Sequence, residues 1–129
     1  MKDLGITHLH LLPVYDYASV DETKSDKPQF NWGYDPENYN VPEGSYSTDP
    51  YNGAVRVSEM KQMVKTLHDN QISVIMDVVY NHVYNASDFC VNQIVPGYFS
   101  RVNEDGTYSN GSDCGNDTAS ERSMVRKYI

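Results

Sequence analysis

Basic residues are scarce in this 129-residue chain. Lysine and arginine number 10 against 18 aspartates and glutamates, which leaves a formal net charge of −8 at pH 7. Proteins that bind nucleic acid or anionic lipid neutralise phosphates with clustered lysine and arginine. We therefore expect neither nucleic acid nor a membrane surface as a partner, and a neutral ligand suits this chain better.

Long apolar runs and metal-ligand cysteine spacing are also lacking. No stretch approaches the ~20 apolar residues of a membrane span, and Met1 leads directly into sequence typical of a folded domain, not of a signal peptide. The location therefore stays open between the cytoplasm and export. Cys90 and Cys114 form no CxxC pair and have no histidine nearby at metal-ligand spacing, so they predict no zinc site. One disulfide and two free thiols remain equal alternatives.

The segment from Ile72 to His82 is the most informative part of what is present. Its β-branched apolar residues predict a strand buried on both faces, which is typical of a parallel sheet in an α/β fold. Ligands of such folds bind beyond the carboxyl ends of the strands. The first candidates for chemistry are therefore the polar residues that end this run, Asp77, Tyr80, Asn81 and His82.

The preceding sequence predicts a strand, a long loop and a helix. Residues 6–14 are mostly apolar and reach Pro13, which has no N–H for further pairing, so a first strand is expected there. Residues 16–51 are irregular and rich in Tyr, Asn and Pro, and loops of this length are usually functional. The apolar spacing of residues 57–69 predicts an amphipathic helix, with Asn70 as a left-handed cap. A right-handed βαβ crossover with two parallel neighbouring strands follows.

The last third of the chain predicts two smaller elements. Asn103 to Gly106 carries the signal of a hairpin turn, and Ser120 is placed to cap a helix over residues 121–129. The chain opens on what resembles the tail of a helix and stops within the apolar pattern of another. We therefore expect residues 1–129 to be a partial domain with no complete domain among them.

Histidines and an aspartate in the strands suggest two further sites. His8 and His10 lie on the same face of the first strand, as two imidazole ligands of a barrel metallohydrolase would. Apolar residues still follow them in the strand, so structural histidines are the preferred interpretation. Asp77 lies within an apolar run and needs a cation or several hydrogen-bond donors, and an arginine on the next strand is the expected partner.

Two motifs follow one another along the chain. The first, Phe30-Asn-Trp-Gly-Tyr-Asp-Pro36, lies in the loop after the first strand, and the second, Asp77-Val-Val-Tyr-Asn-His-Val83, lies at the end of the next strand. The second resembles the first conserved region of the α-amylase superfamily, glycoside hydrolase family thirteen. The first is similar to the signature of the type I pullulanases. Gln71 departs from the pattern, because relatives commonly have glycine there. The resemblance covers essentially the whole chain and includes Leu4 to Pro13, Leu67 to Asn70 and Cys114 to Arg122.

The resemblance implies a fold and a set of sugar contacts. The parent fold is a (β/α)8 TIM barrel, of which this α/β chain would supply about strands two and three, their long βα loops and the start of helix three. Tyr34 matches the aromatic platform under the sugar ring, Asp35 a hydrogen-bond partner of that sugar, and His82 the histidine that contacts its hydroxymethyl group. Supporting positions are Asn81, which ligates calcium in some members, Asp77, and the pocket-wall residues Trp32 and Tyr80.

The same resemblance places bond cleavage outside this chain. Retaining glycosidases need two carboxyl groups roughly 5 to 5.5 Å apart, and in this family they lie on later strands, the nucleophile within an Arg-x-Asp pattern that is absent here. We expect no catalytic residue within the chain, which alone would be inactive. The parent would hydrolyse α-1,6 linkages in pullulan, branched starch or glycogen. It would need no organic cofactor, and calcium would be structural at most.

Two alternatives remain. An isoamylase or a glycogen debranching enzyme would share the second motif, but the Asp35-Pro36 ending of the first argues against both. A non-catalytic carbohydrate-binding protein would use Tyr34, Trp32 and His82 to bind an α-glucan without cleaving it.

Overall fold

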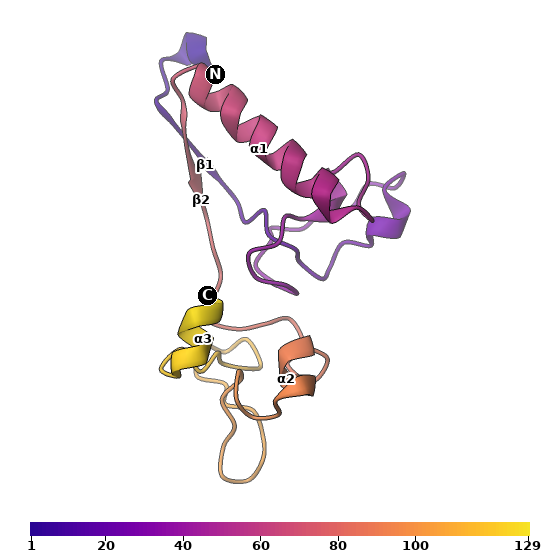
Figure 1. Cartoon of the computed structure of the whole chain (residues 1–129), viewed down its shortest axis with the longest axis vertical. Helices are drawn as coiled ribbons and strands as arrows, with labels where there is room; N and C mark the ends of the chain where they lie inside the picture. Colours follow the sequence, from indigo (N-terminus) through magenta and orange to yellow (C-terminus); the bar gives the residue numbers. More distant parts are fainter.

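The computed structural model describes all residues, 1–129, and contains one long helix beside two short strands (Figure 1). The remaining elements are short and are separated by long turns. In chain order the elements are η1 (Lys2–Leu4), β1 (His8–Leu11), η2 (Glu22–Lys24), η3 (Gly44–Tyr46), α1 (Gly53–Asp69), β2 (Ser73–Met76), α2 (Cys90–Ile94) and α3 (Ser123–Tyr128), where η denotes a 3-10 helix.

Strands β1 and β2 form a two-stranded parallel sheet, as the sequence pattern predicts. His8 lies opposite Ser73 and Leu11 opposite Met76, and the chain passes between the strands through α1, which runs beside them in Figure 1. Pairing stops before Pro13, whose ring nitrogen carries no hydrogen, so β1 is shorter than predicted. The carboxyl ends of both strands lie at the same edge of the sheet.

Helix α1 begins at Gly53, because the side chain of Asn52 accepts a hydrogen bond from Ala54 N–H at 3.1 Å and caps the first turn. This start precedes the predicted residue 57, since the first turn is outside the apolar stripe. The predicted left-handed cap at Asn70 is wrong: its φ is −94°, and Gln71 takes the left-handed position with φ 63°.

Backbone hydrogen bonds explain this end of α1. The N–H of Gln71 donates to the His68 carbonyl at 2.8 Å, and the N–H of Ile72 donates to the Leu67 carbonyl at 2.9 Å, which is the Schellman pattern of a helix end. The side-chain amide of Asn70 donates to the Thr66 carbonyl, so Asn70 stays close to helical geometry. The reversal therefore falls on Gln71.

The apolar core lies after β2, in the lower part of the molecule as drawn in Figure 1. Phe89 and Phe99 pack with ring centroids 4.8 Å apart, and Tyr39 reaches them from the loop after β1, 5.8 Å from Phe99. The strand β2 was predicted to be buried on both faces, but Ile75 is 45% exposed. Within this chain β1 pairs with one edge of that strand, and α1 packs against it. The core consists of Tyr39, Val83, Ala86, Phe89, Phe99 and Val125.

The turn over Asn103–Gly106 is confirmed, since Asn103 N–H donates to the Thr107 carbonyl at 2.8 Å and one antiparallel bridge joins Val102 to Tyr108. The predicted cap at Ser120 is wrong. A turn closed by Arg122 N–H and the Ala119 carbonyl delays α3 to Ser123.

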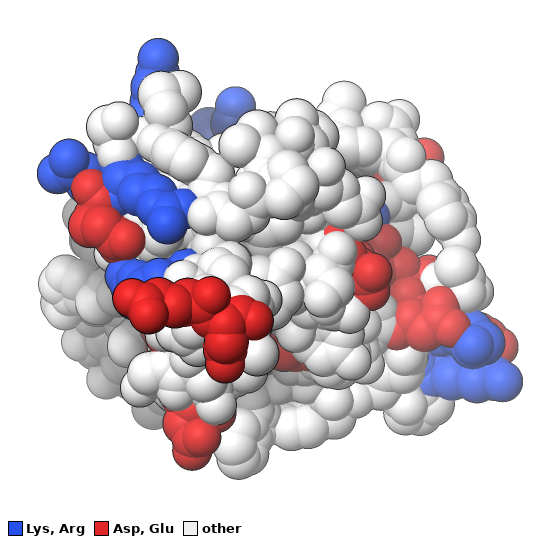
Figure 2. Space-filling model, turned by 90° about the horizontal axis from the view of Figure 1, so that it is seen from below, with Lys and Arg blue, Asp and Glu red and all other residues white.

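The surface carries two thiols and dispersed charges. Cys90 and Cys114 are both exposed free thiols, which decides between the two alternatives left by the sequence. The helices are too short or too polar for a membrane span. Figure 2, a view from below, shows acidic and basic side chains in small groups separated by wide uncharged areas.

Candidate functional site

The loop after β1 folds back on itself and covers the carboxyl end of its own strand. Tyr17 forms an antiparallel bridge with Pro36, and Ala18 N–H donates to the Asp35 carbonyl at 3.1 Å. Gly33 has φ 84°, and a Cβ there would lie 2.5 Å from the carbonyl oxygen of Pro13. Only glycine fits this approach, which brings the motif in the loop against the end of β1.

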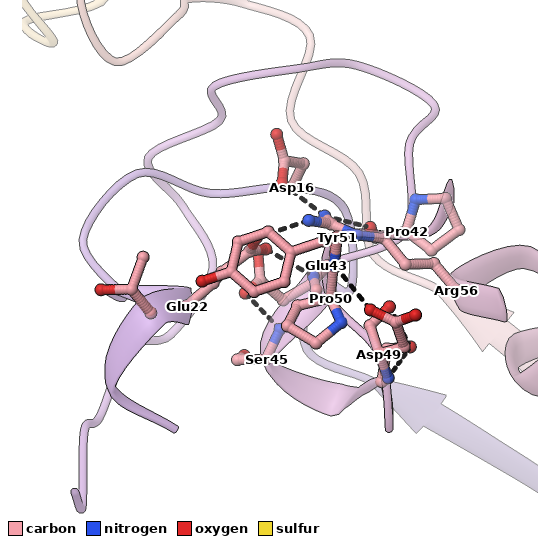
Figure 3. A network of polar contacts seen from close by, with 12 residues as sticks. Asp16, Glu22, Pro42, Glu43, Ser45, Asp49, Pro50, Tyr51 and Arg56 are labelled. Carbon is pink, nitrogen blue, oxygen red and sulfur yellow. Dashed lines mark hydrogen bonds and ion pairs between the residues drawn. The ribbon is translucent and has the colours of Figure 1, made fainter. Parts of the chain in front are cut away.

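One arginine anchors this loop to α1 (Figure 3). The Arg56 side chain is only 14% exposed, and it pairs with Glu22 and with Asp16, whose Oδ1 is 3.1 Å away. It also donates to the carbonyls of Pro50 at 2.6 Å and Pro42 at 3.3 Å. A guanidinium with its donors engaged in this way fixes four points of the loop at once.

A third carboxylate adjoins this arginine site. Glu43 is buried and accepts hydrogen bonds from Tyr17 N–H and Ser45 N–H, each at 3.0 Å, while burial raises its pKa. Its carboxylate and those of Asp16 and Glu22 offer ligand atoms within 4.8 Å of one another, the only acidic, histidine or cysteine group spaced for a metal. Arg56 already supplies positive charge to this group, so its ion pairs explain why the three carboxylates lie close together.

His8 and His10 belong to no such group, and the metallohydrolase alternative therefore has no third ligand of these types. His8 Nδ1 lies 2.8 Å from Thr7 Oγ1. His10 Nε2 lies 3.9 Å from Asp77 Oδ2.

Asp77 and Tyr34 join the two predicted motifs. The hydroxyl of Tyr34 donates to Asp77 Oδ2 at 2.7 Å, and this hydrogen bond to a carboxylate raises the Tyr34 pKa. The sequence predicts an arginine partner for Asp77, and within this chain the partner is Tyr34 with His10 further away. The Asp77 side chain is 31% exposed, so it is less buried than predicted.

His82 is 7% exposed and lies next to the loop motif. Burial lowers the pKa of its imidazole, opposed by a polar contact with the Tyr34 backbone and by the charges of Asp35 and Asp117. Its Nδ1 lies 3.0 Å from Asn81 Oδ1. The ring is therefore biased towards its neutral form near pH 7, in which one nitrogen can donate a hydrogen bond to a hydroxyl group.

The remaining predicted residues have different surroundings. Asp35 accepts two hydrogen bonds from Ser19, one from the Ser19 N–H at 2.9 Å and one from the Ser19 hydroxyl. Tyr80 donates to Asn40 Oδ1 at 2.7 Å, and this hydrogen bond holds the loop after β1 against the second motif. Trp32 is 63% exposed and meets only the exposed Phe30 edge to face, with centroids 6.3 Å apart.

The structure thus brings Tyr34, Asp35, Asp77 and His82 together at the carboxyl ends of the strands. Trp32 lies beside them in the same loop, while Tyr80 and Asn81 support the site from the second motif. Gly33, Arg56 and Tyr39 are three further residues that shape the site and were not predicted to do so. Of these three residues, only Gly33 could have been inferred from the sequence, because it lies within the motif of residues 30–36.

Calcium was expected at Asn81 in some relatives of this kind. Calcium takes six to eight oxygen ligands, whereas Asn81 Oδ1 faces an imidazole nitrogen and no group of three acidic, histidine or cysteine side chains surrounds it. A structural calcium ion at Asn81 stays a prediction.

Comparison with known proteins places the chain in a family. The family model of the alpha amylase catalytic domain matches residues 1–95. This chain belongs to the alpha-amylase family. Family membership and the parallel βαβ unit confirm the prediction of an α/β segment of a (β/α)8 barrel.

Within the alpha-amylase family, the chain is similar to pullulanases. The pullulanase of Bacillus subtilis strain 168 is 50% identical over 129 residues, which are 100% of this chain and 18% of that protein. Pullulanase 1, chloroplastic, of Arabidopsis thaliana is 36% identical over 161 residues, 100% of this chain and 16% of that protein. This chain therefore spans less than a fifth of the length of these relatives.

A solved structure gives the same picture. The crystal structure of pullulanase from Paenibacillus barengoltzii, in complex with maltohexaose and alpha-cyclodextrin, superposes with a TM-score of 0.93 at 57% identity. The match covers 98% of this chain and 20% of that one. That pullulanase structure thus shares the loop geometry described above, because nearly every residue of this chain takes part in the superposition.

Proposed function

We propose that this chain supplies sugar-binding residues to a debranching glycoside hydrolase, which cleaves α-1,6-glucosidic linkages in pullulan, branched starch or glycogen with retention of configuration. The observation that carries the proposal is the meeting of Tyr34, Asp77 and His82 at the carboxyl ends of two parallel strands, in a chain similar to pullulanases along its whole length. The Paenibacillus barengoltzii relative is described with bound maltohexaose, which supports an α-glucan as the ligand.

Each residue has a role that its surroundings permit. The exposed ring of Tyr34 is held by Asp77 and offers a flat apolar face for a sugar ring. The imidazole of His82 forms a hydrogen bond with a sugar hydroxyl from its neutral form, in which one ring nitrogen donates and the other accepts. Asp35, anchored by Ser19, keeps lone pairs for accepting a second hydroxyl. These residues bind and orient the substrate.

Bond cleavage needs a nucleophile and an acid/base carboxyl from other parts of the barrel. We assign neither role to Asp35 or Asp77, because both carboxylates are engaged as described. The proposal includes no organic cofactor, since two carboxyl groups and water suffice for this chemistry. Neither nucleic acid nor a membrane is proposed as a partner.

The test uses the complete protein encoded by the gene, with pullulan as substrate and reducing ends as the readout. Tyr34→Ala and His82→Ala should each lower kcat/KM about tenfold or more, because contacts that strengthen in the transition state are lost. Tyr51→Ala removes an exposed tyrosine outside the site and serves as control. Unchanged turnover in either site variant would remove the role given to that residue, and no release of reducing ends by the wild type would remove the hydrolase proposal.

A sugar-binding function without cleavage is the second candidate, favoured by the exposed rings of Trp32 and Tyr34. Trp32 is the only tryptophan within residues 1–129, so the difference in fluorescence between the wild type and Trp32→Phe reports on that loop. Saturable quenching by maltohexaose, together with no hydrolysis of pullulan by the complete protein, would select this candidate.

A further inference from the structure

The backbone on both sides of His82 is hydrogen-bonded to a later segment of the chain. Thr118 N–H donates to the Asn81 carbonyl at 2.9 Å. The buried side chain of Asn116 accepts from Val83 N–H at 3.0 Å and donates to the Val83 carbonyl at 2.6 Å. One asparagine amide thus replaces the pairing that a neighbouring strand would give.

The carbonyl of His82 itself accepts a single hydrogen bond in this chain, from the hydroxyl of Tyr39. Tyr39 is buried, and its hydroxyl also lies 3.0 Å from Thr118 Oγ1. A buried carbonyl without a partner is rare and unfavourable. The position of the Tyr39 hydroxyl therefore limits where the backbone of His82 can lie.

The ring of Tyr39 is fixed independently of its hydroxyl. It packs 5.8 Å from Phe99 and 5.1 Å from Tyr80, centroid to centroid, within the apolar core. The hydroxyl is therefore delivered to His82 by a rigid ring that has little freedom to move.

We propose that Tyr39 is a positioning residue for His82, whose carbonyl it fixes so that the imidazole stays beside the Tyr34 backbone. Tyr39 acts through His82, because it is buried below the site. The inference rests on the proposed function in one respect, namely that His82 contacts the sugar. A purely structural role for Tyr39 is the competing explanation.

The variant Tyr39→Phe separates these explanations, since it keeps the packed ring and removes one oxygen atom. The matched control is Tyr108→Phe. Tyr108 is half-buried against the same core and donates to the Ala86 carbonyl at 3.3 Å, so its variant also removes one hydrogen bond, but without touching His82.

The first measurement is steady-state cleavage of pullulan by the complete protein. Tyr39→Phe should lower kcat about tenfold with KM changed less than about twofold, because small misplacement of a transition-state contact affects the chemical step. Tyr108→Phe should leave both constants within about twofold. Equal kcat in Tyr39→Phe and wild type, or an equal loss in the control, would overturn the proposal.

The second measurement is proton NMR of the imidazole C2–H signals, and it does not depend on enzymatic activity. The chain has four histidines, so His82→Gln identifies the signal of His82. Tyr39→Phe should shift this signal and raise its titration midpoint towards the usual range, as water reaches the ring while the charges of Asp35 and Asp117 stay in place.

The two measurements fail in different ways. An unmoved His82 signal in Tyr39→Phe overturns the positioning role whatever the activity. A shifted signal in a protein that does not cleave pullulan supports the positioning role and removes the proposed hydrolase function.

Discussion

The hydroxyl of Tyr34 lies 2.7 Å from Oδ2 of Asp77, so an exposed aromatic ring in the loop after β1 is tied to the end of β2. The two residues are 43 positions apart. The relationship links the two sequence motifs directly and defines how the ring can face a ligand.

Removing the charge of Asp77 should release Tyr34. In Asp77→Asn we expect the Tyr34 pKa to fall towards its usual value of about 10, because the hydrogen bond to a carboxylate and its charge both raise it. The measurement is a pH titration of tyrosine Cζ signals by 13C NMR, with Tyr34→Phe identifying the signal. His10→Gln keeps the carboxylate and should leave the Tyr34 titration in place; an unmoved Tyr34 in Asp77→Asn would contradict the bond.

Arg56 should be among the residues most sensitive to substitution. Arg56→Met leaves the carboxylates of Asp16 and Glu22 mostly buried without their cation, and loss of one partner from such a group costs about 2 to 4 kcal/mol of unfolding free energy. Urea unfolding followed by circular dichroism measures the change. Lys65→Met breaks the exposed pair of Lys65 with Asp69 and should cost less than about 0.5 kcal/mol. Similar losses in both variants would contradict the anchoring role of Arg56.

Gly33 and Gly106 allow close approach and backbone strain to be separated. Both have positive φ, 84° and 86°, but a Cβ at Gly33 would meet Pro13 whereas a Cβ at Gly106 meets nothing within 4 Å. Gly106→Ala should cost about 1 kcal/mol of unfolding free energy for the left-handed conformation. Gly33→Ala adds an overpacking cost of about 1 to 3 kcal/mol. Thermal unfolding measures whether Gly33→Ala loses more stability than Gly106→Ala. Equal losses of stability in the two variants would refute the overpacking at Gly33.

Gln71→Gly should stabilise the chain. Gln71 has φ 63°, a conformation that costs a residue with a Cβ about 1 kcal/mol relative to glycine. The neighbouring Asn70 has φ −94°, so Asn70→Gly relieves no strain and loses the bond to the Thr66 carbonyl. We expect a rise in the unfolding midpoint for the first variant and a fall for the second. The opposite order would show that the reversal occurs at Asn70.

Asp117 should contribute to the loss of stability in acid. Hydrogen bonds from Ser109 and Ser112 lower the pKa of its carboxyl, so the unfolded chain binds more protons at this position than the folded chain. Its stabilisation is therefore present above the ordinary pKa of about 3.9 and is lost as the pH falls through and below that value. Asp117→Asn should flatten the decrease in urea midpoint between about pH 5 and pH 3. Ser109→Ala removes one hydrogen-bond donor, so its decrease in urea midpoint should lie between those of the wild type and Asp117→Asn. An unchanged decrease in Asp117→Asn would contradict the contribution of Asp117 to the loss of stability in acid.

The parts of the fold that follow from local pattern could be predicted from the sequence. The apolar residues of α1 recur at helical spacing, and those of β2 form a β-branched run. Both patterns lie within short stretches of sequence, so the helix, the strand and their parallel crossover could all be inferred. Asp77, Tyr80, Asn81 and His82 could be proposed because polar residues that end a parallel strand lie at the ligand-binding edge of the sheet. Tyr34, Asp35 and Trp32 could be proposed only from the resemblance to the α-amylase superfamily.

The parts that depend on distant partners could not be predicted. Arg56 resembles any charged residue of an exposed helix until Asp16 and Glu22 are placed beside it. The cap of α1 was assigned by residue preference to Asn70, but hydrogen bonding moved the reversal to Gln71. The hydroxyl of Tyr34 reaches Asp77 only because the loop after β1 folds back over the end of its strand, and the apolar run around Asp77 contains no sign of that contact.

The hydroxyl of Tyr39 connects His82 to Thr118, which is 79 residues further along the chain than Tyr39. Contacts between such distant residues form late, because the intervening chain must first lose its conformational freedom. During synthesis the two strands and α1 are complete well before residue 118 leaves the ribosome. We therefore expect a growing chain to carry the loop after β1 in the open, and His82 to reach its final position only after the segment containing Asn116 and Thr118 has emerged.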